Sequence, residues 1–310
     1  MNVLFAINEA FVPGFISTAF SFCYNNEGKH RLFVMHDGLT EKSVRLIHKR
    51  LSRFGCEINL VDIGMGAFSD DLFRSLPRYY SQSINRLLPQ QAVPEDVHRL
   101  LYLDSDLTIN GSLQEFYDID LKGNFLAAPS VRRDGQDGGP YWDQEAGVYD
   151  LLKIPLEPET TYFNSGVLLL DVDAFRNLDV TFYVNVVQKH KEQIMFADQD
   201  ILNLAFEGKT LNVIDRRLNC TIPNNMRLRK GEYRWIRREV KALHYVVATK
   251  PWMYTKYTNP LFKVYMHYYR CEAGLIIWLW RYMVWALAKP FHFLAHCQRK
   301  ALSVLKVAHV

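Results

Sequence analysis

The chain has 310 residues, of which 49% are hydrophobic and 23% are charged, so it has enough apolar surface for a large core. Its 16 glycines and 12 prolines are ordinary numbers and nothing repeats, which excludes collagen-like, coiled-coil and low-complexity proteins. The net charge of +4 is uneven, because residues 251–310 hold eight Lys or Arg and one acid, and residues 1–250 are left at −3. This asymmetry predicts two functions on one chain.

Short apolar runs alternate with segments of helical periodicity over the first 250 residues. Thr40 and Gly55 stand where an N-cap and a C-cap of one of these helices are expected. The alternation predicts an α/β fold with a mostly parallel, doubly wound central sheet, in which ligands collect at the carboxyl ends of the strands. In chain order we expect a strand at 3–7, a helix at 11–24, a strand at 31–36, a helix at 41–54, strands at 56–63 and 100–103, a long irregular loop at 130–160, a strand at 163–171, helices at 182–191 and 199–206, and strands at 211–214 and 242–247.

The five cysteines are scattered and form no Cys-x-x-Cys pair, and no secretory signal precedes the first expected strand. This pattern argues against a disulfide framework or a zinc site and favours a reducing compartment. Asn110 and Asn219 begin formal glycosylation sequons, but without a signal peptide these have no predictive value.

An acidic pair follows the strand expected at 100–103. Asp104 and Asp106 are two residues apart, so their carboxylates point to the same side and can share one divalent cation. Hard oxygen ligands suit magnesium or manganese, which can neutralise a diphosphate. The simpler interpretation is a solvated acidic turn, because Asp-x-Asp alone is common.

The same segment, Leu103–Thr108 (LDSDLT), also matches the Asp-x-Asp-x-Thr nucleophile loop of haloacid-dehalogenase-type phosphatases. That family places the motif on its first strand, whereas three expected strands precede it here. We keep a phosphatase as a remote alternative.

Three further segments accompany the acidic pair. Asn164, Ser165 and a glycine interrupt the apolar strand expected at 163–171, where a glycine often marks close approach of a ligand or of backbone. Asp198 and Gln199 begin a helix, where Asp198 alone would be interpreted as an N-cap. The last segment runs from His244, at the end of an apolar strand, to Lys250 in a Lys-Pro-Trp sequence. Taken alone, His244 would be interpreted as a structural residue and Lys250 as a surface residue.

Taken together, these segments resemble glycosyltransferase family 8, the bacterial lipopolysaccharide and capsule α-hexosyltransferase group. The resemblance covers residues 1–252 in order: FAIN near the start, Asn-Arg-Leu at 85–87, LYLDSD, YFNSGVLLL, DQDILN, and HY followed by KPW. It implies a GT-A nucleotide-sugar-binding fold in which Asp104, Asp106 and His244 hold a manganese or magnesium ion on the diphosphate of a UDP-sugar. The other donor-binding residues that it implies are Ala6, Asn8 and Phe11 at uridine, Arg86, Asn164 and Ser165 at the sugar, Lys250 at a phosphate, and Ser105 and Val247.

The resemblance also implies a retaining reaction, with Asp198 at the hydroxyls of the donor sugar and Gln199 near its anomeric carbon. A double displacement requires a carboxylate nucleophile below that carbon. Since Gln199 is a poor nucleophile, we favour a front-face mechanism in which the leaving phosphate deprotonates the acceptor hydroxyl.

Two positions depart from the family pattern. Asn8 stands where Asp is common, although its carbonyl can still accept from uracil. Val247 stands where glycine is usual, and a β-branched residue disfavours the positive φ that brings backbone N–H groups to a phosphate. The second departure leaves open an alternative, a membrane-bound, non-catalytic member that binds a sugar nucleotide or a partner.

The last 60 residues hold four of the six tryptophans among Lys and Arg. The most apolar stretch, 275–288, is shorter than the ~20 residues of a spanning helix and contains Arg281. Interleaved aromatic and basic residues favour the interface of an anionic membrane over a plain core helix, and the acidic body argues against nucleic acid.

We therefore expect a GT-A catalytic domain at 1–252 and a helical, membrane-associating region at 253–310. The predicted enzyme moves galactose or glucose from a UDP-hexose to a glycan or lipid-linked acceptor. Its predicted location is the cytoplasmic face of the cell membrane, as a peripheral protein.

Overall fold

The structure is a computed structural model and describes residues 1–64, 84–130, 162–221, 230–246, 250–253 and 260–287. The chain forms two compact units. The first comprises Met1–Cys220 and Arg238–His244, and the second comprises Thr221–Arg237 and Tyr245–Val310. The boundary that we expect at residue 252 remains a prediction.

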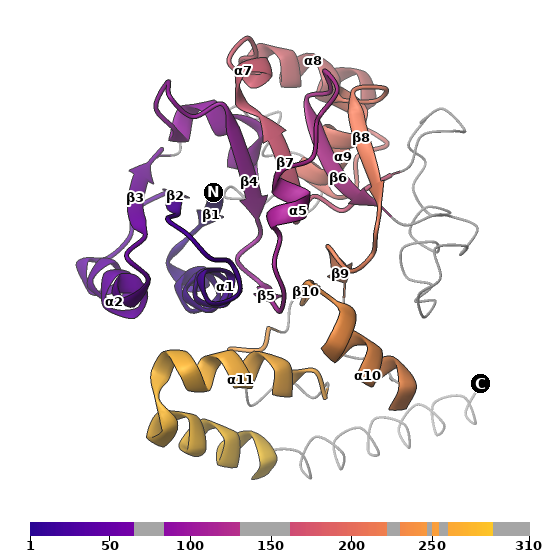
Figure 1. Cartoon of the computed structure of the whole chain (residues 1–310). Coiled ribbons are helices and arrows are strands. Elements are labelled where there is room, and N and C mark those ends of the chain that lie inside the picture. The colour runs from indigo at the N-terminus through magenta and orange to yellow at the C-terminus, as the bar shows by residue number, and fades with distance from the viewer. Residues whose placement is uncertain (65–83, 131–161, 222–229, 247–249, 254–259, 288–310) are drawn as a thin grey trace, which may run out of the picture. The chain divides into compact units, whose positions relative to one another are not determined.

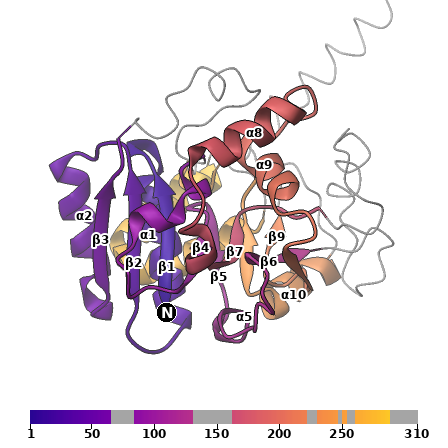
Figure 2. The ribbon, with the colours of Figure 1, turned by 90° about the horizontal axis from the view of Figure 1, so that it is seen from above.

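A seven-stranded sheet organises the first unit, in the order β3-β2-β1-β4-β7-β6-β8. Figure 2 shows β3, β2, β1 and β4 side by side in this order. Every neighbouring pair is parallel except the two pairs that β7 forms with β4 and β6, so the mostly parallel sheet is confirmed. The strands are β1 (Asn2–Ile7), β2 (Arg31–His36), β3 (Glu57–Asp62), β4 (Arg99–Leu103), β6 (Leu126–Ser130), β7 (Val167–Asp171) and β8 (Thr210–Ile214).

Helices cover the two faces of this sheet because alternate strand residues point to opposite sides. On one face Phe5 of β1 meets Phe15 of α1 edge to face, with ring centroids 4.9 Å apart. On the other face Leu4 of β1 belongs to a core that also contains Tyr183 of α8 and Ile201 of α9. The long helices of this unit, visible in Figure 1, are α1 (Val12–Asn25), α2 (Glu41–Leu51), α8 (Val180–His190) and α9 (Ala197–Ala205), and the short ones are α5 (Gln114–Tyr117) and α7 (Val172–Phe175).

The predicted caps of the second helix are confirmed. The Thr40 side chain accepts the Ser43 N–H at 3.2 Å, and α2 continues into a 3₁₀ turn, Ser52–Phe54. Gly55 ends that turn at φ 59°, a left-handed conformation that glycine adopts without steric cost.

A three-stranded sheet, in the order β5-β10-β9, lies beyond the end of β4. Its strands are β5 (Leu107–Ile109), β10 (Ala242–His244) and β9 (Cys220–Thr221). The pairing of β5 with β10 is antiparallel and places His244 opposite Leu107. This register brings His244 to the acidic turn after β4.

Several boundaries differ from the sequence-based expectation. The strand expected at 163–171 begins only at Val167, so Asn164 and Ser165 lie in the turn before β7 and not within a strand. The strand expected at 242–247 ends at His244. The loop expected at 130–160 falls, apart from Ser130, outside the described residues.

The second unit contains α11 (Phe262–Ala273) and a further helix over residues 275–287. Gly274, at φ 91°, separates them, and Phe262 stacks on Trp285 with ring centroids 4.6 Å apart. The second helix therefore folds back along the first. The chain boundary between the units falls within α10 (Lys230–Glu239), of which residues 230–237 belong to the second unit. Within the described ranges, no helix combines the length and hydropathy needed to cross a membrane.

Candidate active site

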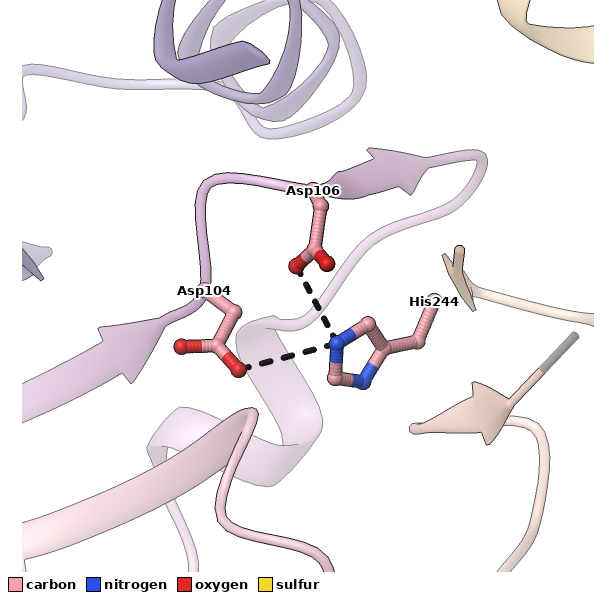
Figure 3. A group of neighbouring side chains, drawn as sticks. All are labelled: Asp104, Asp106 and His244. Carbon is pink, nitrogen blue, oxygen red and sulfur yellow. Dashed lines mark ion pairs between the residues drawn. The ribbon is translucent and has the colours of Figure 1, made fainter. Parts of the chain in front are cut away.

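Two carboxylates and one imidazole converge at the end of β4. His244 Nε2 lies 3.1 Å from Asp106 Oδ1 and 3.6 Å from Asp104 Oδ2, as Figure 3 shows. The three side chains each offer one ligand atom, and these atoms lie within 4.8 Å of one another. The structure thus brings together the three residues that the resemblance implies as metal ligands.

The surroundings of this group fit a divalent cation. The side chains of Asp104, Asp106 and His244 are 20%, 11% and 4% exposed, so two carboxylates approach within 4.8 Å of each other where little of either is exposed to solvent. Such an arrangement is costly unless a positive charge compensates it. Two carboxylate oxygens and an imidazole nitrogen are also a ligand set that manganese accepts.

A glycine makes the approach of these groups sterically feasible. A Cβ built on Gly166 would lie 2.3 Å from His244 Cε1 and 2.9 Å from Asp104 Oδ2. Its carbonyl accepts the Asp104 N–H at 2.8 Å, which ties the turn before β7 to the end of β4. The glycine predicted to mark a close approach therefore leaves room for Asp104, Asp106 and His244, the three candidate ligands that form the metal-ligand set.

Arg86 joins the metal-ligand set to the residues expected at the donor sugar. Its guanidinium contacts Asp104 Oδ1 at 2.8 Å and Asp198 Oδ2 at 3.1 Å, and it donates to both the carbonyl and the hydroxyl of Ser165 at 2.9 Å. Burial alone would lower the pKa of Arg86, but the two facing carboxylates more than offset burial and raise it. Arg86 therefore remains a cation that pairs with both carboxylates.

Tyr102 contacts both Arg86 and Asp104. The Arg86 guanidinium stacks 4.5 Å from the centroid of the Tyr102 ring. Burial raises the pKa of Tyr102 well above its usual value, so the hydroxyl keeps its proton and donates to Asp104 Oδ1 at 2.8 Å. Asp104 thus uses Oδ1 for these two donors and turns Oδ2 toward His244.

The amide of Gln199 is fixed by the turn before β7. Its Oε1 accepts from Asn164 Nδ2 at 2.8 Å and from the Ser165 N–H at 3.3 Å. Its Nε2 donates to the Tyr162 hydroxyl at 2.6 Å. Four residues of the predicted donor-sugar set, Asn164, Ser165, Asp198 and Gln199, are therefore in one hydrogen-bonded cluster with Arg86.

Asp200 anchors the start of α9 beneath this cluster. One carboxylate oxygen accepts the Tyr162 hydroxyl, and the other accepts the N–H groups of Met195 and Phe196 at 2.6 and 2.7 Å. Burial raises the pKa of Asp200, and these donors oppose that effect. Asp198, by contrast, lies within the first turn of α9 and forms no cap of that helix, so its interpretation as an N-cap is wrong.

The predicted uridine residues lie at the end of β1. Because β1 runs parallel to β4, the carboxyl ends of both strands meet at one edge of the sheet. Ala6 is half-buried in β1, and Asn8 Oδ1 accepts the Phe11 N–H at 3.2 Å, which caps a 3₁₀ turn.

The three remaining predicted residues, Ser105, Lys250 and Val247, lie in different parts of the chain. Ser105 is buried between the two acidic ligands. Lys250 belongs to the second unit, where its ammonium donates to the Tyr245 carbonyl at 2.9 Å. Val247 lies outside the described residues.

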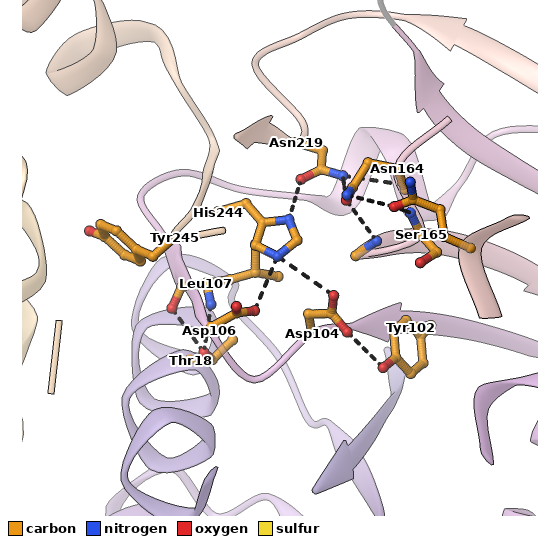
Figure 4. A network of polar contacts seen from close by, with 12 residues as sticks. Thr18, Tyr102, Asp104, Asp106, Leu107, Asn164, Ser165, Asn219, His244 and Tyr245 are labelled. Carbon is orange, nitrogen blue, oxygen red and sulfur yellow. Dashed lines mark hydrogen bonds and ion pairs between the residues drawn. The ribbon is translucent and has the colours of Figure 1, made fainter. Parts of the chain in front are cut away.

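The sequence did not predict the roles of Tyr102 and Asn219 in the site. Tyr102 follows the strand alternation of an ordinary core residue, and only its contact with Arg86 and Asp104 sets it apart. Asn219 lies in a loop and carries a sequon, but it is only 4% exposed and its side chain contacts His244 and Asn164 (Figure 4). Nothing in its sequence neighbourhood indicated that role.

Fold and site together define an α/β protein with a three-residue candidate cation site at the carboxyl edge of a mostly parallel sheet. The sequence profile of glycosyl transferase family 8 matches residues 2–256. The chain belongs to that family. The remote phosphatase alternative is therefore wrong, as is the interpretation of the acidic pair as a plain solvated turn, since both side chains are largely buried against His244.

Named relatives agree with this membership. The chain is 26% identical over 267 residues to lipopolysaccharide 1,2-glucosyltransferase of Escherichia coli K12, covering 81% of this chain and 72% of that protein. It is 28% identical over 157 residues to lipopolysaccharide 1,3-galactosyltransferase of Salmonella typhimurium LT2, covering 50% and 44%. The crystal structure of the galactosyltransferase LgtC with donor and acceptor sugar analogs superimposes with a TM-score of 0.69 at 23% identity, covering 89% and 97%. The GT-A fold is thereby confirmed.

Proposed function

We propose that this chain transfers galactose or glucose from a UDP-sugar to a hydroxyl of a cell-surface glycan or glycolipid. The convergence of Asp104, Asp106 and His244 in a family 8 chain is the observation that carries the proposal. The names of the relatives support it, since two act on lipopolysaccharide as glucosyl- and galactosyltransferases.

In this proposal Asp104 and Asp106 hold manganese or magnesium through carboxylate oxygens, and His244 holds it through Nε2. The bound metal supplies positive charge against the diphosphate of the donor. Arg86 pairs with Asp104 Oδ1 and orients that carboxylate, while the hydroxyl and amide groups of Ser165 and Asn164 line the adjoining sugar position. Stabilising charge on a leaving group in this way is usually the largest catalytic effect.

The hydrogen bonds and ion pairs around Gln199 support a front-face reaction that retains the anomeric configuration. Gln199 is an amide held by three hydrogen bonds, and both neighbouring carboxylates are engaged. Asp198 pairs with Arg86, and Asp200 accepts three hydrogen bonds. For double displacement, Asp198 or Asp200 would have to break these contacts before it could act as a nucleophile. In a front-face reaction both carboxylates keep their contacts, because the leaving phosphate takes the proton from the hydroxyl of the acceptor.

The deciding experiment measures UDP release from a panel of UDP-sugars with manganese, and then with excess chelator. We expect turnover with UDP-galactose or UDP-glucose that chelator abolishes and added manganese restores. Full activity in EDTA would reject the metal assignment. Tight UDP-sugar binding without turnover on any acceptor would favour the non-catalytic alternative, and an inverted anomeric configuration by proton NMR would reject retention.

We further propose that residues 253–310 bind the protein to the anionic cytoplasmic face of the cell membrane. The helix over 275–287 supports this, because it exposes large apolar side chains: Leu275, Ile276, Ile277, Leu279, Trp280, Met283 and Leu287. Several recur at helical spacing, as at 276, 280, 283 and 287, so they form one stripe. A stripe of this kind with neighbouring basic residues suits the membrane interface.

A further inference from the structure

The Asn219 side chain lies between the metal-ligand set and the residues expected at the donor sugar. Its Oδ1 is 3.0 Å from His244 Nδ1, and its Nδ2 is 2.9 Å from Asn164 Oδ1 (Figure 4). Asn219 immediately precedes β9, which shares the small sheet with β10, the strand that ends at His244. The residue is 4% exposed.

Backbone N–H groups fix the direction of every hydrogen bond in this chain of contacts. The Gly166 N–H donates to Asn164 Oδ1 at 3.0 Å, and the Ser165 N–H donates to Gln199 Oε1, so both oxygens are acceptors. Asn164 must then present Nδ2 to Gln199, and Asn219 must present its own Nδ2 to Asn164. Asn219 Oδ1 therefore faces His244, and since that oxygen can only accept, Nδ1 carries a hydrogen, which leaves Nε2, 3.1 Å from Asp106 Oδ1, as the nitrogen that a metal would take.

We propose that Asn219 is a positioning residue that holds His244 with its Nε2 lone pair aimed between Asp104 and Asp106. The proposal rests on the proposed function, because it assigns the residue that orients the ligand of that metal. It also assigns a second role to the same amide. Through Asn164, Asn219 fixes the amide of Gln199, so one buried side chain sets both the metal and the sugar side of the site.

The physical basis of this positioning is the placement of the hydrogen on the His244 imidazole. A neutral imidazole can bind a metal through Nε2 only when its hydrogen is on Nδ1, and an acceptor on Nδ1 both selects that tautomer and restricts rotation of the ring. Removing such a partner typically weakens metal binding by about 10- to 100-fold. An Asn-to-Ala change also leaves Asn164 Oδ1 with one donor in place of two.

Isothermal titration of manganese into three variants tests the proposal. Asn219→Ala should weaken manganese binding by about 10- to 100-fold. Asn219→Asp keeps an acceptor for His244 but has no N–H for Asn164, so manganese affinity should stay within about tenfold of wild type while kcat at saturating manganese falls. Asn26→Ala is the matched control, because Asn26 is equally buried at 4% and its side chain bonds the Phe22 carbonyl, the Leu113 N–H and the Ser112 hydroxyl; it should leave manganese affinity unchanged.

Nitrogen-15 NMR of the metal-free wild type reports the tautomer directly, with His244→Gln used to assign the ring. We expect a hydrogen on Nδ1, and a ring that carries hydrogen on Nε2 alone would overturn the proposal, as would wild-type manganese affinity in a folded Asn219→Ala variant. If Asn219→Ala does not fold, the manganese affinity and kcat of Asn219→Asp and the NMR assignment of the His244 hydrogen decide the question. Failure of the wild type to bind manganese would instead reject the metal in the proposed function, and the tautomer would still test Asn219.

Discussion

Gly166 and His244 approach so closely that no side chain fits between them. A Cβ at position 166 would lie 2.3 Å from His244 Cε1 and 2.7 Å from Nδ1, well inside van der Waals contact. The imidazole cannot withdraw easily, since its side chain is 4% exposed and bonded to Asn219. The glycine in the turn before β7 is therefore a condition for the metal-ligand geometry.

Gly166→Ala should disable the site. Moving His244 and Asp104 apart by even 1 Å should lower turnover by about 100-fold, and forcing a methyl group into this packed position should cost about 1–3 kcal/mol of the free energy of unfolding. Thermal denaturation with and without manganese, together with UDP release, measures both effects. Gly231→Ala is the control, because a Cβ there meets nothing within 4 Å, and wild-type manganese stabilisation of Gly166→Ala would contradict the argument.

Arg86 makes contacts that lysine cannot reproduce. Its planar fork bonds Asp104, Asp198 and Ser165 at once, and its face stacks on Tyr102. Arg86→Ala leaves two largely buried carboxylates without their cation, so the free energy of unfolding should fall by about 3–5 kcal/mol. Arg86→Lys restores the charge at one point only and should recover part of that loss, with turnover still reduced.

Urea denaturation of both variants measures this difference. Arg45→Lys serves as the control, since Arg45 forms an exposed i,i+4 pair with Glu41 and such pairs contribute well under about 1 kcal/mol. Equal stability of Arg86→Lys and wild type would show that charge alone, and not the guanidinium geometry, holds the cluster.

The central strands could be predicted from the sequence because they are continuous apolar runs, as expected where both faces of a parallel sheet are covered. β6 was missed for a physical reason. Its sequence, Leu-Ala-Ala-Pro-Ser, has low strand propensity, and Pro129 has no N–H to donate. The pairing with β7 covers only Leu126 and Ala127, so the proline lies beyond it. Tertiary contacts, and not local preference, make this segment a strand.

The sequence likewise predicted only part of the candidate site. Asp104 and Asp106 stand two residues apart and form a local pattern, whereas the metal-ligand role of His244 followed only from the family resemblance. Its position depends on the pairing of β10 with β5, which no local pattern encodes. Asn219 and Tyr102 were missed because asparagine in a loop and tyrosine in a strand are ordinary, and their contacts appear only once the chain is folded.

Acid should loosen the loop that precedes α1. The Glu9 carboxylate accepts hydrogen bonds from Ser43 Oγ at 2.5 Å and from the N–H and hydroxyl of Thr40, and these lower its pKa below the usual 4.5. A carboxyl whose pKa is depressed by folding stabilises the protein above its unfolded pKa, and that contribution is lost as pH falls through the folded value. The effect is small because Glu9 is exposed.

Glu9→Gln should therefore lower the melting temperature slightly at neutral pH, and the difference from wild type should shrink as pH falls below 4.5. Melting curves of both proteins over this range measure it, with exposed Glu27→Gln as the control. A difference that stays constant with pH would mean that the Glu9 hydrogen bonds do not depend on its charge.

Serine substitutions on the apolar stripe should release the protein from anionic vesicles. Ile276 and Leu287 are 83% and 69% exposed, so Ile276→Ser with Leu287→Ser should leave the fold and the metal-ligand set intact. Each side chain contributes about 1.5–3 kcal/mol when fully buried in an apolar phase, so the double variant should weaken vesicle binding by at least about tenfold. The control pair, Tyr24→Ser with Ile214→Ser, removes apolar residues that are 53% and 43% exposed in the first unit and should bind as wild type.

Co-sedimentation with phosphatidylglycerol vesicles at low and high salt separates the two contributions to this binding. The eight Lys and Arg of residues 251–310 contribute about 1 kcal/mol each near such a surface, and this part should weaken as salt shortens the Debye length. A chain ending near residue 256 should lose vesicle binding and activity on a lipid-linked acceptor, yet keep manganese binding and transfer to a soluble acceptor. Equal pelleting of full-length and truncated protein would refute the tether. Resistance of the full-length protein to alkaline carbonate would instead indicate a spanning segment, because an interfacial helix held by charge and a shallow apolar stripe is extracted under those conditions.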